Sequence, residues 1–433
     1  MSHSDDMFVL LPPDVLYIIF SFCDVQTLGR LSCVCRRFNT FFKQSYVWSQ
    51  RSRNIVATNQ RDRRMLQRSL HVLEAVEKCW QSVRWQTGRY EEKVLLQHHI
   101  MYIPWLQLEQ DVLWYSKGAV ILKFERLQDG RIEENALLTL RGHMDDVGHF
   151  VCKNGLVVSG GNDGSLCVWT ASHGTSVHRR YHCNSKAINS VDYSRNVVVT
   201  GSQDRTVKVW TLAPPQSSTQ RTLGAQSSTL RTLGAQSSTL RTFGTQSSTL
   251  RYTIPIWDRV CSVAILENSR VLLTGSAGCN GVTPLQAFDL GTGRHLASLG
   301  TSHRNGAGVL HVYPESPIEV LSCGYDTFIR LWDLRCATKC VRAWEDPHDS
   351  TVYCLATDHN VTVLSGTSRY GVVRLWDKRM TRPVKMYYVG KCNSPVYSVA
   401  FDPCYMYVAL DRSLAMLSFT GPSWTPQAAT QVF

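Results

Sequence analysis

The feature that most constrains the fold is a segment that recurs four times, in which a turn precedes a short β-rich run that ends in tryptophan. Its copies are GGNDGSLCVW at 160–169, GSQDRTVKVW at 201–210, CGYDTFIRLWD at 323–333 and TSRYGVVRLWD at 367–377. An aspartate precedes the tryptophan by six residues in the first three copies, and Tyr370 takes its place in the fourth. Self-similarity at a period of about 40 residues predicts stacked repeats that bury one another's apolar faces.

A histidine, or a residue that takes its place, lies upstream of each copy, and with it the pattern resembles the WD repeat. The resemblance implies that the turn Asp accepts a hydrogen bond from the His, which is also linked to a Ser or Thr and to the Trp indole. A buried polar network of this kind must be closed, so these groups are interpreted as structural and not as catalytic. The sets are His143–Ser159–Asp163–Trp169, His182–Thr200–Asp204–Trp210 and His303–Ser322–Asp326–Trp332, with His348 and Trp376 in a further repeat.

Counting these units predicts a mainly β fold, a seven-bladed WD-repeat propeller over residues 93–433. The first and fourth units are degenerate, and the last lacks an outer strand. Lys93–His98, just before the first unit, could supply that strand and close the ring. The predicted units are 100–141, 142–180, 181–254, 255–298, 299–343, 344–387 and 388–433.

A low-complexity insertion at 216–247 repeats the decamer QSSTLRTLGA with small changes. Each copy resembles an outer propeller strand, but only one copy can occupy that position. The copy at Ser248–Ile254 has the right spacing to the next unit, so the others are expected to form a loop on the face opposite the recognition surface. A neutral insertion is favoured over a phosphorylated regulatory tail.

Residues 8–50 form a second unit, predicted to be helical. Two prolines followed by Asp14 favour a helix start, and apolar residues then recur at helical spacing. Because so small a unit cannot bury this apolar surface alone, it needs a partner or the rest of the chain. The pattern resembles the F-box, which implies docking onto the Skp adaptor, and through it onto a cullin. The positions implied are Leu11, Pro12, Val15, Leu16, Ile19, Phe20, Leu28, Leu31, Val34, Cys35, Phe38 and Trp48.

Residues 51–92 carry apolar side chains along a basic background and are predicted to form a helical linker. In F-box/WD-repeat proteins such a linker fixes the distance between adaptor and substrate. The alternative is a solvated connector without a positional role.

The composition excludes several function classes. Fifteen cysteines occur without any CxxC spacing, so no zinc or redox motif is predicted, and the thiols are expected to be reduced, in the cytoplasm, the nucleus or both. No apolar run is long enough to span a membrane. We find no nucleophile–base pair, phosphate loop or metal cluster, and therefore predict a non-enzyme without cofactors.

The resemblance to the F-box/WD-repeat family implies the substrate-recognition subunit of an SCF-type cullin–RING E3 ubiquitin ligase. Two alternatives stay open. One is a WD-repeat scaffold whose F-box acts outside ubiquitination. The other is an RNA- or chromatin-binding propeller that uses the net charge of +12, although this charge is better explained by a solvated basic helix and a mildly basic propeller.

The substrate is expected to bind where the turn before each Trp strand and the start of each innermost strand converge. Several arginines would be needed there to bind a doubly phosphorylated segment. Only Arg369 is found among aromatic and amide side chains, which predicts a pocket for an apolar or singly charged peptide of a protein whose identity the sequence does not give. The predicted substrate-binding residues are Asn162, Asn189, Gln203, Tyr325, Tyr353, Arg369 and Tyr397.

Overall fold

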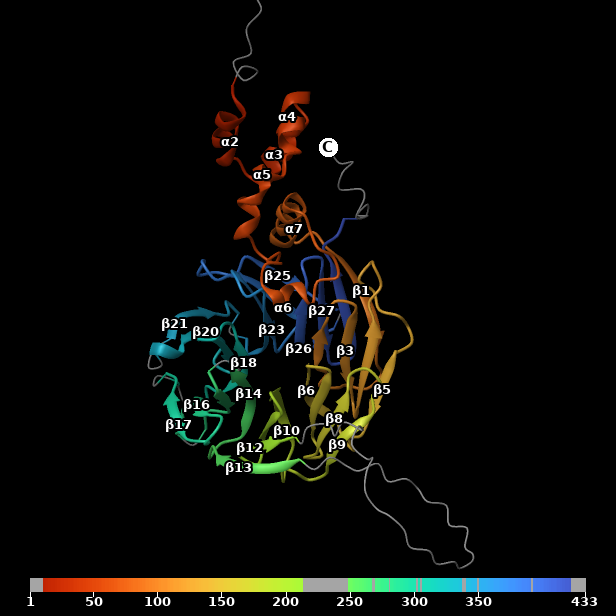
Figure 1. Cartoon of the computed structure of the whole chain (residues 1–433), viewed down its shortest axis with the longest axis vertical. Coiled ribbons are helices and arrows are strands. Elements are labelled where there is room, and N and C mark those ends of the chain that lie inside the picture. Colours follow the sequence, from red (N-terminus) through yellow and green to blue (C-terminus); the bar gives the residue numbers. More distant parts are fainter. Residues whose placement is uncertain are drawn as a thin grey trace, which may run out of the picture.

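The computed structural model describes residues 11–212, 248–266, 269–279, 281–300, 303, 306–336, 340–348, 350–390 and 392–421. Over these residues the chain forms short N-terminal helices followed by seven four-stranded antiparallel sheets around a common axis (Figure 1). The predicted fold class, a seven-bladed propeller preceded by a helical unit, is confirmed. The helices extend beyond the edge of the ring near β25 (Lys385–Tyr388) and β1 (Glu91–Gln97) (Figure 1).

Local sequence signals explain where the N-terminal helices begin. Pro13 occupies the first turn of α2, where a missing N–H costs nothing. Asp24 caps α3 by accepting the Thr27 N–H at 2.6 Å, and Glu74 and Glu77 form a capping box at the start of α7. The helical elements are α2 (Pro13–Ser21), α3 (Val25–Ser32), α4 (Arg36–Phe42), α5 (Ser45–Ser49), η1 (Arg51–Arg53), α6 (Arg63–Leu66), α7 (Ala75–Thr87) and η2 (Leu334–Cys336).

Six of the sheets are meanders of four consecutive strands, and the seventh joins three consecutive strands to one strand from the N-terminal side of the repeats. The sheets are numbered here as blades 1 to 7 in chain order, and the strands of each blade are given from the innermost outward. Blade 1 contains β2 (Leu106–Leu108), β3 (Val112–Lys117), β4 (Val120–Glu125) and β5 (Leu138–Arg141). Blade 2 contains β6 (Val147–Lys153), β7 (Leu156–Gly161), β8 (Leu166–Thr170) and β9 (Ser176–Arg180). Blade 3 contains β10 (Ile188–Ser194), β11 (Val197–Ser202), β12 (Thr206–Thr211) and β13 (Thr249–Pro255). Blade 4 contains β14 (Val260–Leu266), β15 (Val271–Ser276), β16 (Leu285–Asp289) and β17 (His295–Ser298). Blade 5 contains β18 (Val309–Pro314), β19 (Glu319–Gly324), β20 (Phe328–Asp333) and β21 (Cys340–Glu345). Blade 6 contains β22 (Val352–Thr357), β23 (Thr362–Thr367), β24 (Val372–Asp377) and β25 (Lys385–Tyr388). Blade 7 contains β26 (Val396–Phe401), β27 (Tyr405–Leu410), β28 (Ser413–Ser418) and β1 (Glu91–Gln97).

Blade 7 shows how the ring closes. Its three inner strands come from the C-terminal part of the chain, and β1 pairs antiparallel with β28 as the fourth, with Val94 opposite Ala415. The strand expected near Lys93–His98 therefore supplies the missing outer position. Joining the two ends of the repeat region in one sheet leaves no open blade edge between them.

The outer strand of blade 3 is β13, which pairs with β12 from Thr206 opposite Pro255 to Thr211 opposite Thr249. The copy of the decamer nearest blade 4 thus occupies the outer position, as the spacing predicts. The insertion at 216–247, which we expect to form a loop, lies outside the described residues.

Neighbouring blades are joined by side chains of the innermost strands. The hydroxyl of Ser190 accepts the backbone N–H of Val263 at 3.1 Å, and that of Ser262 accepts the N–H of Val312 at the same distance. Each bond crosses to the next blade and satisfies a buried donor, so the polar atoms add to the apolar packing between blades.

In blade 2 the predicted polar set lies together. Nδ1 of His143 is 3.3 Å from a carboxylate oxygen of Asp163, and Nε2 is 2.6 Å from the Ser159 hydroxyl. The imidazole lies edge-on to Trp169, with ring centroids 6.0 Å apart. Burial disfavours the charged form of His143, but hydrogen bonds to Asp163 and Cys167 outweigh it and raise its pKa to about 9.

In blade 3 the role given to His182 was wrong. Asn184 takes the position, because it donates to Asp204 at 2.9 Å and accepts from the Thr200 hydroxyl at 3.1 Å. The Trp210 indole donates to Thr200 at 3.2 Å, and His182 is exposed. An amide has a donor and an acceptor at the same reach as an imidazole, so it closes the network equally well.

In blade 5 the predicted contact between His303 and Asp326 is not made. Asp326 pairs with Arg330 at 2.5 Å, whereas the His303 ring stacks on Trp332 with centroids 5.9 Å apart. The Trp332 indole still donates to Ser322, at 2.8 Å. The guanidinium of Arg330, on the strand that follows the turn, is thus the partner of the Asp326 carboxylate in place of His303.

In blade 6 the expectation for His348 was wrong as well, because that residue is exposed. The turn aspartate that Tyr370 replaces is supplied from the incoming loop by Asp346, which pairs with buried Arg374 at 2.5 Å. The Trp376 indole donates to Ser365 at 2.8 Å. This blade therefore retains a buried polar network, with its negative charge moved to another segment.

Candidate protein-interaction sites

The F-box-like helices have a small core of their own. Five of the predicted adaptor-binding residues lie inside it, which corrects their assignment to an interface, and the Trp48 indole there donates to the Phe42 carbonyl at 2.7 Å. Because α2 is apolar over most of its circumference, the sequence did not separate the side that packs inward from the side that faces outward. The five buried residues are Leu16, Phe20, Leu28, Phe38 and Trp48.

The outward side of α2 is an exposed apolar face. Val15, Ile18, Ile19 and Phe22 follow one another at helical spacing on one side of the helix, and Phe22 is 87% exposed. Val34, in the turn between α3 and α4, is 68% exposed. We call these five residues the α2 face.

The other predicted adaptor-binding residues divide by burial. Pro12 and Cys35 are exposed, and Leu11 and Leu31 are half-buried. Ile18 and Phe22 were not among the predicted residues, although their spacing from Val15 and Ile19 was a usable signal. Several exposed apolar side chains on a small helical unit indicate a protein partner.

Helix α7 attaches the helical unit to the propeller. The Trp85 ring stacks on Phe419 with centroids 3.7 Å apart, and its indole donates to the Pro403 carbonyl at 2.8 Å. The hydroxyl of Tyr387, on the outer strand of blade 6, donates to the Trp85 carbonyl at 2.6 Å. Because Trp85 is fully buried, the helix is fixed against blades 6 and 7.

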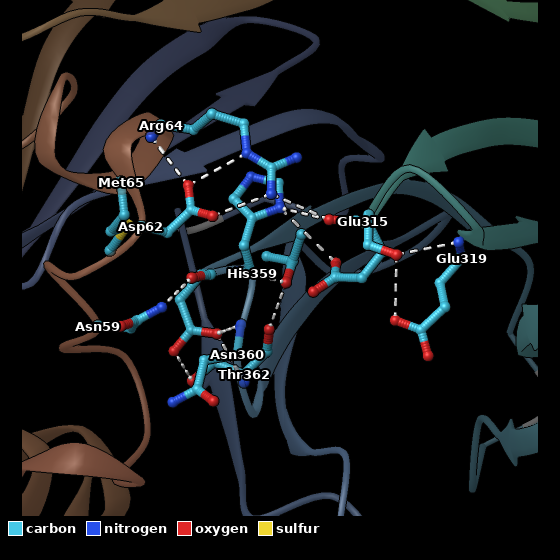
Figure 2. A network of polar contacts seen from close by, with 12 residues as sticks. Asn59, Asp62, Arg64, Met65, Glu315, Glu319, His359, Asn360 and Thr362 are labelled. Carbon is cyan, nitrogen blue, oxygen red and sulfur yellow. Dashed lines mark hydrogen bonds and ion pairs between the residues drawn. The ribbon is translucent and has the colours of Figure 1, made fainter. Parts of the chain in front are cut away.

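The segment before α7 lies across one face of the propeller and is held there by a polar network (Figure 2). Arg64 bonds to Asp62 at 3.0 Å and donates to the backbone carbonyl of Glu315 at 3.0 Å. The Glu315 carboxylate also pairs with Lys378, and its carbonyl lies 3.2 Å from Nδ1 of His359. These residues belong to the linker and to blades 5 and 6, so the network joins all three.

His359 is neutral in this network. Burial is the largest cause, the nearby guanidinium groups of Arg68 and Arg64 add to it, and together they lower the pKa of His359 to about 3. Arg64 pairs instead with the Asp62 carboxylate and donates to the Glu315 backbone carbonyl, and Arg68 donates to the Thr357 carbonyl.

A second group of bonds holds the linker to the first turn of blade 6 (Figure 2). The backbone N–H of Ala57 donates to the Thr362 hydroxyl at 2.6 Å, and the Asn59 amide donates to the Asp358 carbonyl at 2.8 Å. The Thr362 hydroxyl in turn donates to the Asp358 carboxylate at 2.6 Å. Burial raises the pKa of Asp358 to about 6.

Arg126 joins the linker to blades 1 and 7. Its guanidinium donates to the Arg68 carbonyl at 3.0 Å, to the Tyr407 hydroxyl at 3.1 Å, and to the carboxylate of Asp402. Asp402 also accepts the backbone N–H of Leu70 at 3.3 Å. Both charged side chains are fully buried.

The linker, predicted to be helical over residues 51–92, is helical only in part. Only 51–53, 63–66 and 75–87 are helical, and the residues between them follow the propeller surface. They contact the turns between first and second strands in blades 5, 6 and 7. In a meander these turns lie on the face opposite the turns between second and third strands, so the linker and the predicted recognition residues lie on opposite faces.

Four of the predicted substrate-binding residues form two groups on that opposite face. Gln203 donates to Asn189 at 3.2 Å, and Asn189 donates to the Val260 carbonyl at 2.7 Å. Tyr353 and Tyr397 stack with centroids 6.0 Å apart. These contacts order the side chains across neighbouring blades.

The remaining predicted residues include one that needs a correction. Tyr325 lies 3.5 Å from an exposed guanidinium, that of Arg259, so Arg369 is not the lone arginine of this rim. Arg369 lines a cavity of about 550 Å³ on blade 6. Asn162 is half-buried at the β7–β8 turn and joins neither group.

The same face carries exposed apolar side chains farther from the axis, which the sequence reasoning missed. Most of them lie in the loops between blades, Tyr370 lies in the turn before a Trp strand, and Tyr388 is the last residue of β25. The sequence pattern does not say which side chains in these segments are exposed. Trp257 is 72% exposed in the loop between blades 3 and 4. The others are Ile100, Met101, Ile103, Met144, Tyr181, Tyr370 and Tyr388.

Two absences hold for the part of the chain that the structure describes. No group of three or more His, Cys, Asp or Glu side chains is arranged to hold a metal ion. No helix there is both long and apolar enough to cross a membrane.

Comparisons with known proteins agree with this geometry. Residues 8–54 match the F-box-like family model, and residues 134–170, 174–211 and 338–377 match the WD domain, G-beta repeat model. Over 416 residues the chain is 36% identical to human (Homo sapiens) F-box/WD repeat-containing protein 4, also called dactylin. It is 35% identical to the mouse (Mus musculus) protein of that name, and in both cases the match covers 95% of this chain and 93% of the relative.

Proposed function

The chain belongs to the F-box/WD-repeat protein family, and from this premise we propose that it is the substrate-recognition subunit of an SCF-type cullin–RING ubiquitin ligase. The observation that carries the proposal is the exposed α2 face on a helical unit fixed to one face of a propeller. The unit has its own core, so its exposed apolar side chains are available to a partner.

The α2 face is the proposed contact for the Skp adaptor, which would link the chain to a cullin. Fully burying a large apolar side chain stabilises a contact by about 1.5–3 kcal/mol. Ile18 and Phe22 alone can therefore contribute several kcal/mol before the costs of association are subtracted. Pro12, Leu11, Leu31 and Cys35 stay in the proposed contact as its periphery, whereas the buried positions support it from behind.

The chain itself makes and breaks no bonds in this proposal. It holds a captured protein near a ubiquitin-charged enzyme that the cullin recruits, which raises the effective concentration of the reacting groups. Holding a protein in place requires a rigid linker, and the polar contacts of Asp62 and Arg64 together with the buried contacts of Arg126 supply this rigidity. We propose that this activity takes place in the cytoplasm, the nucleus or both, because the cysteine thiols are expected to be reduced.

The substrate is proposed to bind the propeller face opposite the linker. Tyr353, Tyr397 and Arg369, with Arg259 near Tyr325, offer aromatic surface and two separated cations, while Asn162, Asn189 and Gln203 offer amides. Aromatic and arginine side chains contribute most to protein interfaces. This composition favours an extended apolar segment with isolated acidic groups over a multiply phosphorylated one.

Affinity capture of the full chain from cells tests the adaptor contact. Ile18→Asp with Phe22→Asp puts two charges on the α2 face without touching the F-box core, and should remove both adaptor and cullin. Val72→Asp is the matched control, since Val72 is 72% exposed on the linker and lies outside the α2 face. Unchanged capture by the double variant would contradict the proposal.

The same experiment separates the scaffold alternative. A chain that captures the adaptor without any cullin would act outside ubiquitination. Capture of both, with loss of both in the double variant, supports the ligase subunit.

A further inference from the structure

A polar cavity of about 200 Å³ lies where the F-box-like helices, the linker and α7 meet. Ser52 of η1, Thr58 and Arg61 of the linker, and Glu74 and Lys78 at the start of α7 line it. The volume is several times the roughly 30 Å³ that one water molecule takes in the liquid. The cavity is thus large enough for a small polyatomic group.

Thr58 is the first sign that a ligand belongs there. Its side chain is 1% exposed, and its hydroxyl has no hydrogen-bond partner among the described residues. A buried hydroxyl without a partner is costly, and native structures rarely keep one without a reason. An acceptor atom in the cavity would satisfy it.

Two cations at the cavity are the second sign. Among the residues that the structure describes, the side chains of Arg61 and Lys78 make no ion pair and no hydrogen bond. Lys78 is half-buried, and burial first, then the charge of Arg61, lowers its pKa. Two like charges brought together without a counter-ion favour an anion between them.

The nearby carboxylates do not fill this role. Glu74 and Glu77 are engaged in the capping box of α7, in which each side chain accepts a backbone N–H of the other residue. The Glu74 N–H donates to the Glu77 carboxylate at 2.8 Å. Glu74 lines the cavity, so one negative charge stands against the two cations there.

We propose that this cavity binds a tetrahedral oxyanion, a phosphate group, through Arg61, Lys78 and the Thr58 hydroxyl. A phosphate has several strong acceptor oxygens and forms charge-assisted bonds with both kinds of cation. The bound group would connect η1, the linker and α7 and so stiffen the junction between the helical unit and the propeller. This proposal does not depend on the proposed ligase function.

Calorimetric titration of the full chain with inorganic phosphate tests the site, with sodium chloride at matched ionic strength as reference. We compare the wild type with Thr58→Val, Lys78→Met and the control Lys43→Met, which removes an exposed lysine at the end of α4. Phosphate should bind the wild type and the control equally. It should bind Lys78→Met and Thr58→Val at least tenfold more weakly.

Stability without phosphate separates a ligand site from a structural role. Valine keeps the shape of Thr58 and removes the unpaired hydroxyl, so Thr58→Val should melt at or above the wild-type temperature in phosphate-free buffer. Phosphate should raise the melting temperature of the wild type and of the Lys43→Met control, and not that of the two cavity variants. An equal response to chloride, or unchanged phosphate binding in both cavity variants, would overturn the proposal.

Titration with O-phosphoserine distinguishes the source of the group. Binding as strong as that of inorganic phosphate would assign the site to a phosphate ester, and binding of inorganic phosphate alone would assign it to the free ion. Either result supports the oxyanion site.

Discussion

The buried ion pair between Arg126 and Asp402 offers a strict test of how the linker is held. Arg126 donates to carbonyl groups of the linker and of blade 1 and to the Asp402 carboxylate in blade 7. Both side chains are fully buried. Replacing Arg126 by Met keeps most of the volume and removes every one of these donors.

The expected cost can be worked from these contacts. Removing one partner of a buried ion pair costs about 3–5 kcal/mol, because the other charge is left without compensation. Three carbonyl acceptors, on Arg68, Glu109 and Gln110, also lose a donor at roughly 1 kcal/mol each. We therefore expect Arg126→Met to lower the free energy of unfolding by about 6 kcal/mol, and Asp402→Asn by about 4 kcal/mol.

The double variant is the decisive measurement. Once Arg126 is gone, neutralising Asp402 removes the uncompensated charge. Arg126→Met with Asp402→Asn should therefore cost less than Arg126→Met alone, roughly the 3 kcal/mol of the three carbonyl groups that lose a donor, and not the sum of the two single costs. Urea unfolding of the full chain, followed by tryptophan fluorescence, gives all three values. Additive costs would show that the two charges are screened from each other, and would refute the buried pair as the anchor of the linker.

Two further predictions concern the propeller. His143→Asn should lower the free energy of unfolding by about 3 kcal/mol at pH 6 and by little at pH 9.5. The pKa of His143 rises from about 6.5 in the unfolded chain to about 9 in the fold, so the stabilisation is complete below pH 6.5 and is lost as the pH rises through 9. Urea midpoints at the two pH values check this, and a cost that does not change with pH would contradict it. Tyr353→Ala with Tyr397→Ala should abolish capture of the substrate while the adaptor still binds, and dephosphorylating the substrate should weaken capture less than tenfold; complete loss on dephosphorylation would mean that more basic side chains than Arg369 and Arg259 reach the rim.

The blade count was predictable because the third strands of four blades share one pattern at a regular spacing, whereas the polar networks were predictable only in part. Spacing alone put His182 in the network of blade 3, but the backbone brings Asn184 to Asp204 instead. In blade 6 the negative charge moved to Asp346 on another segment. A buried polar network needs a donor or an acceptor at each place but does not fix which sequence position supplies it. A residue with similar donors and acceptors at another position can therefore take part, and a search by spacing alone does not find it.

The prediction for the helical unit was incomplete for a different reason. Periodicity identified the apolar positions of α2, but Leu16 and Ile18 are both apolar and only the packing of the other helices decides which one is buried. The same reason applies to the linker. Around Ala57 and Asn59, hydrogen bonds to the propeller take the place of the helical backbone hydrogen bonds that the pattern predicted. Tertiary contacts, which a single sequence does not contain, decided both outcomes.

Hydrogen–deuterium exchange of the full chain, with and without purified Skp adaptor, tests the central claim most directly. The adaptor should slow exchange in α2 and around Val34, and leave the propeller face around Tyr353 and Tyr397 as accessible as before. Protection of that propeller face, or no protection of α2 at saturating adaptor, would contradict the claim that this chain binds its adaptor through the α2 face and keeps the opposite face free for a substrate.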